Sequence, residues 1–144
     1  MKRFPWTFMI AATVPFVVLS VLVSFHVFKT PLGLELLLTY ASVIVSFLGG
    51  IHLGVAVSKY HESHKIANLL IAESVWPSLI AWGILFYADT HMQLLALTLL
   101  YTLMWAIDSL LYNNDVIPQW FYDLRCIITP IVVVSLYVAY FGLV

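Results

Sequence analysis

Five long apolar segments, separated by short polar breaks, dominate this sequence of 144 residues. Each is about as long as the roughly 20 residues that an α-helix needs to cross a bilayer. Backbone in hydrocarbon must satisfy its own hydrogen bonds, as only helices and closed barrels do, and the segments lack the alternation of barrel strands. We therefore predict an all-α integral membrane bundle of five transmembrane helices. The predicted spans are residues 6–28, 34–57, 66–87, 92–112 and 122–143.

The composition excludes an ordinary soluble protein. Charged residues make up 9% of the chain and hydrophobic residues 63%, whereas soluble domains are about 25% charged. The polar breaks are too short for a further domain, so residues 1–144 are predicted to form one domain. The start "MKRFPWTF" resembles a signal peptide, but the apolar stretch is too long and no small-residue cleavage site follows. We expect a retained first span and a multi-pass protein of the bacterial inner (plasma) membrane.

The basic residues predict the orientation of the chain. With a cytoplasmic N-terminus, the outer side receives one basic residue, Lys29, and the inner side receives the other five: Lys2, Arg3, Lys59, Lys65 and Arg125. Basic residues favour the cytoplasmic side of a membrane, so this asymmetry predicts an N-in/C-out topology. The lipid bilayer is the expected surrounding, and the net charge of −1 argues against a nucleic-acid partner.

Four ionisable residues lie inside the predicted spans at one depth: His52, Glu73, Asp108 and Arg125. His52 and Glu73 are nearly equidistant from the polar break between their spans, and so are Asp108 and Arg125. Antiparallel helices of equal rise then place all four roughly 7–12 Å from the inner boundary.

A lone charge at this depth costs about 2.5–3.5 kcal/mol, so the four residues are predicted to form one network. In this network we expect Arg125 to bond to Asp108 or Glu73. Two interpretations stay open, a functional site and a network that only orders helix packing. Snorkelling of Arg125 and Asp108 to the interface is a further alternative.

Small residues mark the second span. Ser46, Gly50 and Gly54 recur every four residues, and such a stripe lets another helix approach closely. Gly49 lies one turn before His52 and clears space on that side of the helix. We assign Gly49 to helix packing in preference to the alternative, room for a ligand beside the imidazole.

Pro77 in the third span cannot donate a hydrogen bond to the carbonyl of Glu73, four residues earlier. This coincidence predicts a small polar or hydrated cavity near Glu73. Trp76 adjoins Pro77, and we consider a ligand pocket lined by His52, Glu73, Trp76 and Arg125 and open to the inner leaflet. Pro15 is predicted to kink the first span.

The sequence contains no recognised catalytic motif, neither a phosphate-binding loop nor a nucleophile elbow or triad, so we predict no enzyme. No cofactor is predicted, although a haem or quinone near His52 is an alternative; no haem-binding spacing is present. His61 and His64 lie in a polar break without a third ligand, so no metal site is predicted. Cys126 is the single cysteine and is assigned to packing.

Several motifs resemble those of a known family. They are "PF" (15–16), "SFLGGIHLG" (46–54), "WPSLIAW" (76–82) and "PQWFYDLR" (118–125), together with Asp108. In this order they resemble an uncharacterised family of small five-span membrane proteins that includes the mitochondrial transmembrane protein 69. The resemblance covers essentially the whole chain, although members commonly carry Trp where this chain has Leu53. It implies fold and membrane location but no activity. The positions it marks are Gly49, Gly50, His52, Trp76, Pro77, Asp108, Trp120 and Arg125.

Two kinds of function fit these observations. The first expectation is a non-enzymatic accessory or assembly protein whose Ser46–Gly50–Gly54 face docks on a membrane-protein partner or on a second copy in a homo-oligomer. The alternative is a membrane protein that binds a small molecule, such as a lipid, a quinone or a haem-like group, or a small carrier.

Overall fold

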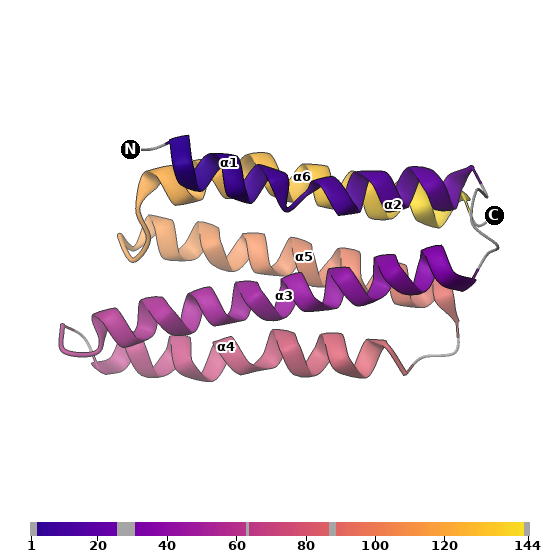
Figure 1. Ribbon diagram of the computed structural model, residues 1–144. Coiled ribbons are helices and arrows are strands. Elements are labelled where there is room, and N and C mark those ends of the chain that lie inside the picture. Colours follow the sequence, from indigo (N-terminus) through magenta and orange to yellow (C-terminus); the bar gives the residue numbers. More distant parts are fainter. Residues whose placement is uncertain (1–2, 26–30, 63, 87–88, 143–144) are drawn as a thin grey trace.

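The computed structural model describes residues 3–25, 31–62, 64–86 and 89–142, and these residues form helices joined by turns (Figure 1). The helices are α1 (Arg3–Ala11), α2 (Val14–Ser24), α3 (Pro31–Lys59), α4 (His64–Ile84), α5 (Thr90–Asn113) and α6 (Gln119–Gly142). Five stretches are long and apolar enough to cross a membrane, and α1 and α2 together form the first of them. The prediction of an all-α bundle is confirmed, with five helical stretches that are long and apolar enough to span a membrane.

The first span breaks between α1 and α2, as predicted from Pro15. Pro15 lies in the first turn of α2 and has no backbone N–H to continue the helix. Two side chains satisfy backbone carbonyls at the break. The Thr13 hydroxyl donates to the Ile10 carbonyl at 2.6 Å, and the Tyr40 hydroxyl of α3 donates to the Ala12 carbonyl at 2.6 Å. The break is therefore anchored to α3.

The helices run side by side, with the two ends of the chain toward opposite ends of the bundle (Figure 1). α3 packs against α2, α4 and α5, and α6 packs against α1, α2 and α5. Residues such as Leu37, Val45 and Leu97 are fully buried in the core between them.

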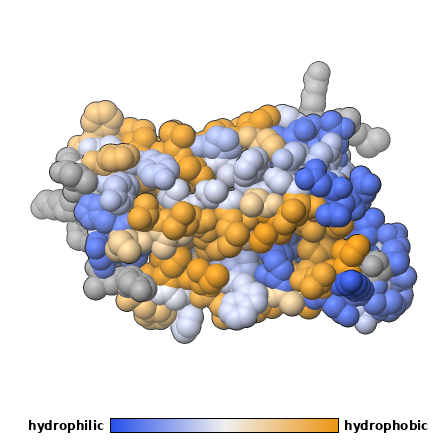
Figure 2. All heavy atoms as spheres, turned by 180° about the vertical axis from the view of Figure 1, so that it is seen from behind, coloured by the Kyte–Doolittle hydropathy of each residue, from blue (hydrophilic) through white to orange (hydrophobic). Residues whose placement is uncertain are grey.

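The outer surface is apolar. Leu99 is 65% exposed and Trp82 is 62% exposed, together with many other large apolar side chains. Hydrophilic residues gather at the ends of the bundle, most densely at the end that carries the α3–α4 and α5–α6 connections (Figure 2). An apolar belt between polar ends suits lipid as the surrounding solvent, and this architecture is that of a multi-pass membrane protein.

Gly49 of α3 lies against the backbone of α4, unlike Gly50 and Gly54. A Cβ atom at Gly49 would lie 2.6 Å from the carbonyl oxygen of Ser74 and 3.7 Å from the ring of Pro77. By contrast, a Cβ at Gly50 or Gly54 would meet nothing within 4 Å. From the sequence we expected Gly50 and Gly54 to allow close helix approach. Within the described chain this contact is made by Gly49, because Gly49 faces α4.

Candidate functional site

His52 of α3 lies between two carboxylates from neighbouring helices. Its Nδ1 atom is 2.8 Å from Oε2 of Glu73 on α4, and its Nε2 atom is 2.7 Å from Oδ1 of Asp108 on α5. The ring is 1% exposed, so both nitrogens have these oxygens as their partners in place of solvent. The small residue Gly49, one turn earlier, lets α4 come close enough for Glu73 to reach the ring.

Arg125 of α6 completes the cluster. Its Nε atom donates to Oδ2 of Asp108 at 2.7 Å, and both side chains are buried. Asp108 therefore holds His52 with one oxygen and Arg125 with the other. The structure brings the four ionisable residues into one continuous polar chain, Glu73–His52–Asp108–Arg125, which joins α3, α4, α5 and α6.

The polar chain can share one proton in more than one way. A ring nitrogen bonds to an ionised carboxylate only if it carries a hydrogen. Either the imidazole of His52 is doubly protonated between two carboxylates, or it is neutral and one of the acids carries the proton. Both arrangements have the same number of protons and total zero charge with Arg125. The ring can thus pass a proton between Glu73 and Asp108 without leaving its position.

Both ends of the polar chain carry an unused polar atom. Oε1 of Glu73 and Nη2 of Arg125 are buried and have no hydrogen-bond partner among the described residues. Leaving such an atom unsatisfied costs about 1–3 kcal/mol, and more for a charged group. These two unpaired atoms add no stability to the helix packing, so a purely structural role for the network does not explain them.

Glu73 faces a groove on the outside of the bundle. Its side chain is 22% exposed and lines a hollow of about 360 Å³ between α4 and α5. Leu70, Ile107 and Val116 also line this groove. Its walls are largely apolar side chains, so Glu73 is the ionisable group that the groove presents.

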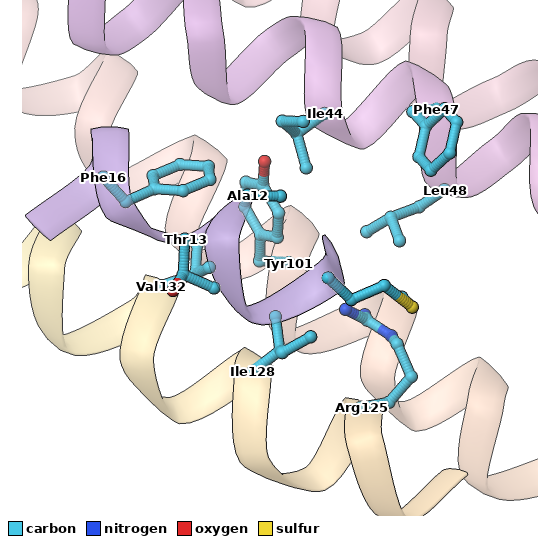
Figure 3. Close-up of a pocket in the computed structure, with 11 residues that line it drawn as sticks. Ala12, Thr13, Phe16, Ile44, Phe47, Leu48, Tyr101, Arg125, Ile128 and Val132 are labelled. Carbon is cyan, nitrogen blue, oxygen red and sulfur yellow. The ribbon is translucent and has the colours of Figure 1, made fainter. Parts of the chain in front are cut away.

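Arg125 faces a separate cavity of about 70 Å³ (Figure 3). Figure 3 shows its guanidinium reaching from α6 toward the lining residues of α3. The other walls come from the α1–α2 break, α5 and α6 and include Ala12, Thr13, Phe16 and Tyr101. Two polar groups in these walls are engaged, because Tyr101 donates to the Ala41 carbonyl at 2.6 Å and Thr13 donates within its own turn.

Comparison with known proteins identifies the family of this chain. The family model described as "Protein of unknown function (DUF3429)" matches residues 1–141. The chain belongs to the DUF3429 family. No curated protein and no solved structure matches it. The match covers all the motifs on which the resemblance was based, and the resemblance to an uncharacterised family is confirmed to that extent.

Not every site residue predicted from the sequence joins the polar chain. Trp76 is 62% exposed on α4 and lines neither hollow described above. Pro77 lies inside α4 and packs at the Gly49 contact, and the helix continues through it. A single pocket lined by His52, Glu73, Trp76 and Arg125 is therefore not what the structure has, because His52 is sealed and Glu73 and Arg125 face different hollows.

Sequence reasoning did not identify Thr13 and Tyr101 as cavity residues, and it noted Phe16 only as part of the "PF" motif. Their signals were a threonine two residues before Pro15 and a polar aromatic residue in the middle of a span, and neither is specific. For metals, no group of three His, Cys, Asp or Glu residues within the described ranges is placed to hold an ion.

Proposed function

We propose that the DUF3429 protein is a non-catalytic protein of the bacterial inner membrane that binds a small apolar molecule in the cavity at Arg125. The observation that carries the proposal is Arg125, which lines this cavity and whose Nη2 atom is a buried charged donor without a partner among the described residues. A molecule with an acceptor atom would satisfy this donor. The apolar walls, such as Phe16 and Ile128, would bury the rest of what enters.

The position of Arg125 favours binding over a structural role alone. The hydrogen bond from Nε to Asp108 already neutralises the guanidinium and ties α6 to α5. A lysine could supply that single bond, whereas arginine adds donors in a planar fork. The Arg125 side chain lines a cavity, and its surplus donor has no partner on another helix of the described chain, as expected for a group that binds a ligand.

The location and orientation are part of the same proposal. The excess of basic residues at one end of the bundle supports an N-in topology, and this topology would place the polar chain in the inner half of the bilayer. The motifs that resemble the mitochondrial transmembrane protein 69, such as "GGIH" at 49–52, suggest that such proteins share the site.

Purification from native membranes in a mild detergent tests the proposal. Extraction and mass spectrometry of the wild-type protein should reveal a bound small molecule. Ala12→Leu adds volume to the cavity wall and should lose that molecule, whereas Ala11→Leu, at an exposed position next to it, should keep it. A wild-type protein without any bound molecule, or an Ala12→Leu variant that retains it fully, contradicts the proposal.

A second candidate function is the accessory role, and the outward face of α3 favours it. Ser46, Gly50 and Gly54 are exposed, and nothing lies within 4 Å of a Cβ at either glycine. This face would accept a transmembrane helix of a partner protein, since small residues allow close backbone contact.

Gly50→Leu should then abolish co-purification of the partner without lowering the thermal stability of the isolated protein. Gly83→Leu is the matched control, because Gly83 on α4 is also exposed with open space around its Cβ position. Loss of the partner in both variants, or in neither, argues against this face.

A further inference from the structure

The molecule held at Arg125 can be described by its chemistry, and this step rests on the proposed function. We infer that it is an apolar chain that ends in a neutral carbonyl group, whose oxygen accepts a hydrogen bond from Arg125. Four features of the cavity lead to this class, namely the free donor, the charge balance, the size and the side from which the cavity is reached.

The free donor determines that the ligand atom is an acceptor. A guanidinium has N–H donors and no acceptor, and Nη2 is buried without a partner. The hydroxyl hydrogens of Thr13 and Tyr101 are already used on backbone carbonyls. Among the described residues of this wall, Arg125 is thus the side chain with a hydrogen left to donate, so the ligand must supply an oxygen or a similar acceptor.

The charge balance determines that the acceptor is neutral. The polar chain contains two carboxylates, one guanidinium and one imidazole, so its charge is zero only when one shared proton is present. An anionic ligand at Arg125 would add a third negative charge close to Asp108 in a low-dielectric region, where like charges repel strongly. A carboxylate or phosphate ligand would therefore need an additional proton, and a neutral acceptor would need none.

The size and the walls favour a carbonyl over other neutral groups. The cavity of about 70 Å³ is small for a ligand site, since pockets that enclose drug-sized molecules measure about 300–1,000 Å³. A short end group fits this space and a large ring does not. An alcohol would bring a hydrogen that needs its own acceptor among mostly apolar residues such as Leu48, Ile128 and Val132, whereas a carbonyl brings none.

The route to the cavity favours a chain that stays in the bilayer. The α3 wall includes Ile44, which is half-buried, and Phe47, which is 61% exposed on the lipid-facing side. Figure 3 shows both side chains on the α3 border of the cavity, opposite the α1–α2 break. A carbonyl bound at Arg125 can therefore remain attached to an acyl chain that extends past Phe47 into lipid.

Four probes of equal chain length test the inference on the full-length protein in lipid nanodiscs. They are methyl hexadecanoate, hexadecanoate, hexadecanol and hexadecane, and native mass spectrometry with thermal unfolding measures their binding near neutral pH. The methyl ester should bind about tenfold tighter than each of the others, the size of one hydrogen bond to a charged donor. Arg125→Lys keeps a cation beside Asp108 and should remove this preference.

The variants and outcomes separate the inference from the proposed function. Ala12→Leu should weaken binding of every probe, and Ala11→Leu should bind as the wild type does. Equal or tighter binding of the acid, the alcohol or the alkane overturns the neutral-carbonyl inference, although binding itself stands. If no probe binds and no molecule co-purifies, the proposed function fails as well. An Arg125→Lys protein that folds and still prefers the ester also overturns the inference.

Discussion

Arg125 and Asp108 depend on each other, because Arg125 would be an uncompensated charge in hydrocarbon without Asp108, and Asp108 would keep only His52 as a partner. Their hydrogen bond is 2.7 Å long and both side chains are almost fully buried. Burying such a pair need not stabilise a protein more than apolar residues would, but breaking it from one side is costly. Individual residues of the polar chain therefore act as a unit.

A double-mutant comparison tests this dependence. Arg125→Met leaves Asp108 buried without its cation and should lower the free energy of unfolding by about 3–5 kcal/mol. Arg125→Met combined with Asp108→Asn removes both charges and should cost less than Arg125→Met alone. Unfolding in detergent measures both proteins. If the double variant loses as much stability as the sum of the two single variants, the pairing is contradicted.

At the scale of the helices, rotation about the axis decides what each residue does. Gly49 and Gly50 are neighbours in sequence, yet Gly49 faces the backbone of α4 and Gly50 faces outward. The close α3–α4 approach at Gly49 lets His52 and Glu73 meet. A helix pair that is pushed apart here would thus lose the Glu73 end of the polar chain.

Gly49→Ala and Gly50→Ala form a matched pair for this contact. The added methyl group at Gly49 would lie 2.6 Å from the Ser74 carbonyl oxygen, so the variant should be less stable by about 1–3 kcal/mol, as for other overpacked sites. The same change at Gly50 meets open space and should not lower stability. Thermal unfolding compares the two, and equal effects would contradict the assigned orientation.

The sequence predicted the level of the ionisable residues along the helices better than the directions in which their side chains point. Equal distances from the polar connections placed His52, Glu73, Asp108 and Arg125 at one level, since antiparallel helices rise equally. The rotation of each helix about its axis depends on packing contacts with other helices, and these contacts cannot be inferred from a single sequence. For this reason the separate hollows of Glu73 and Arg125 could not be predicted, whereas the break at Pro15 follows from local backbone chemistry.

For the whole molecule, an odd number of spans places the chain ends on opposite sides of a membrane. The two ends of the chain lie toward opposite ends of the bundle (Figure 1), and the connection after Lys59 lies at the end where α1 begins. From the basic residues we predict that this end faces the cytoplasm.

Reporter fusions test this assignment. A reporter at residue 60 and one at residue 114 should both be cytoplasmic, because both positions lie in connections at the same end of the bundle. A reporter at the C-terminus should be outside. A C-terminal reporter in the same compartment as the one at residue 60 would contradict five spans. If all three reporters lie on the side opposite to the expected one, the chain has the opposite orientation in the membrane.

The order of the polar chain along the sequence has a consequence for biosynthesis. Glu73 and Asp108 are made before Arg125, which belongs to the last span. A nascent chain that lacks α6 carries both acids in its spans without the guanidinium, and such groups are costly in lipid. We expect these unfinished chains to stay with the insertion machinery or to be degraded. Insertion of the fifth span supplies the guanidinium and should remove this cost.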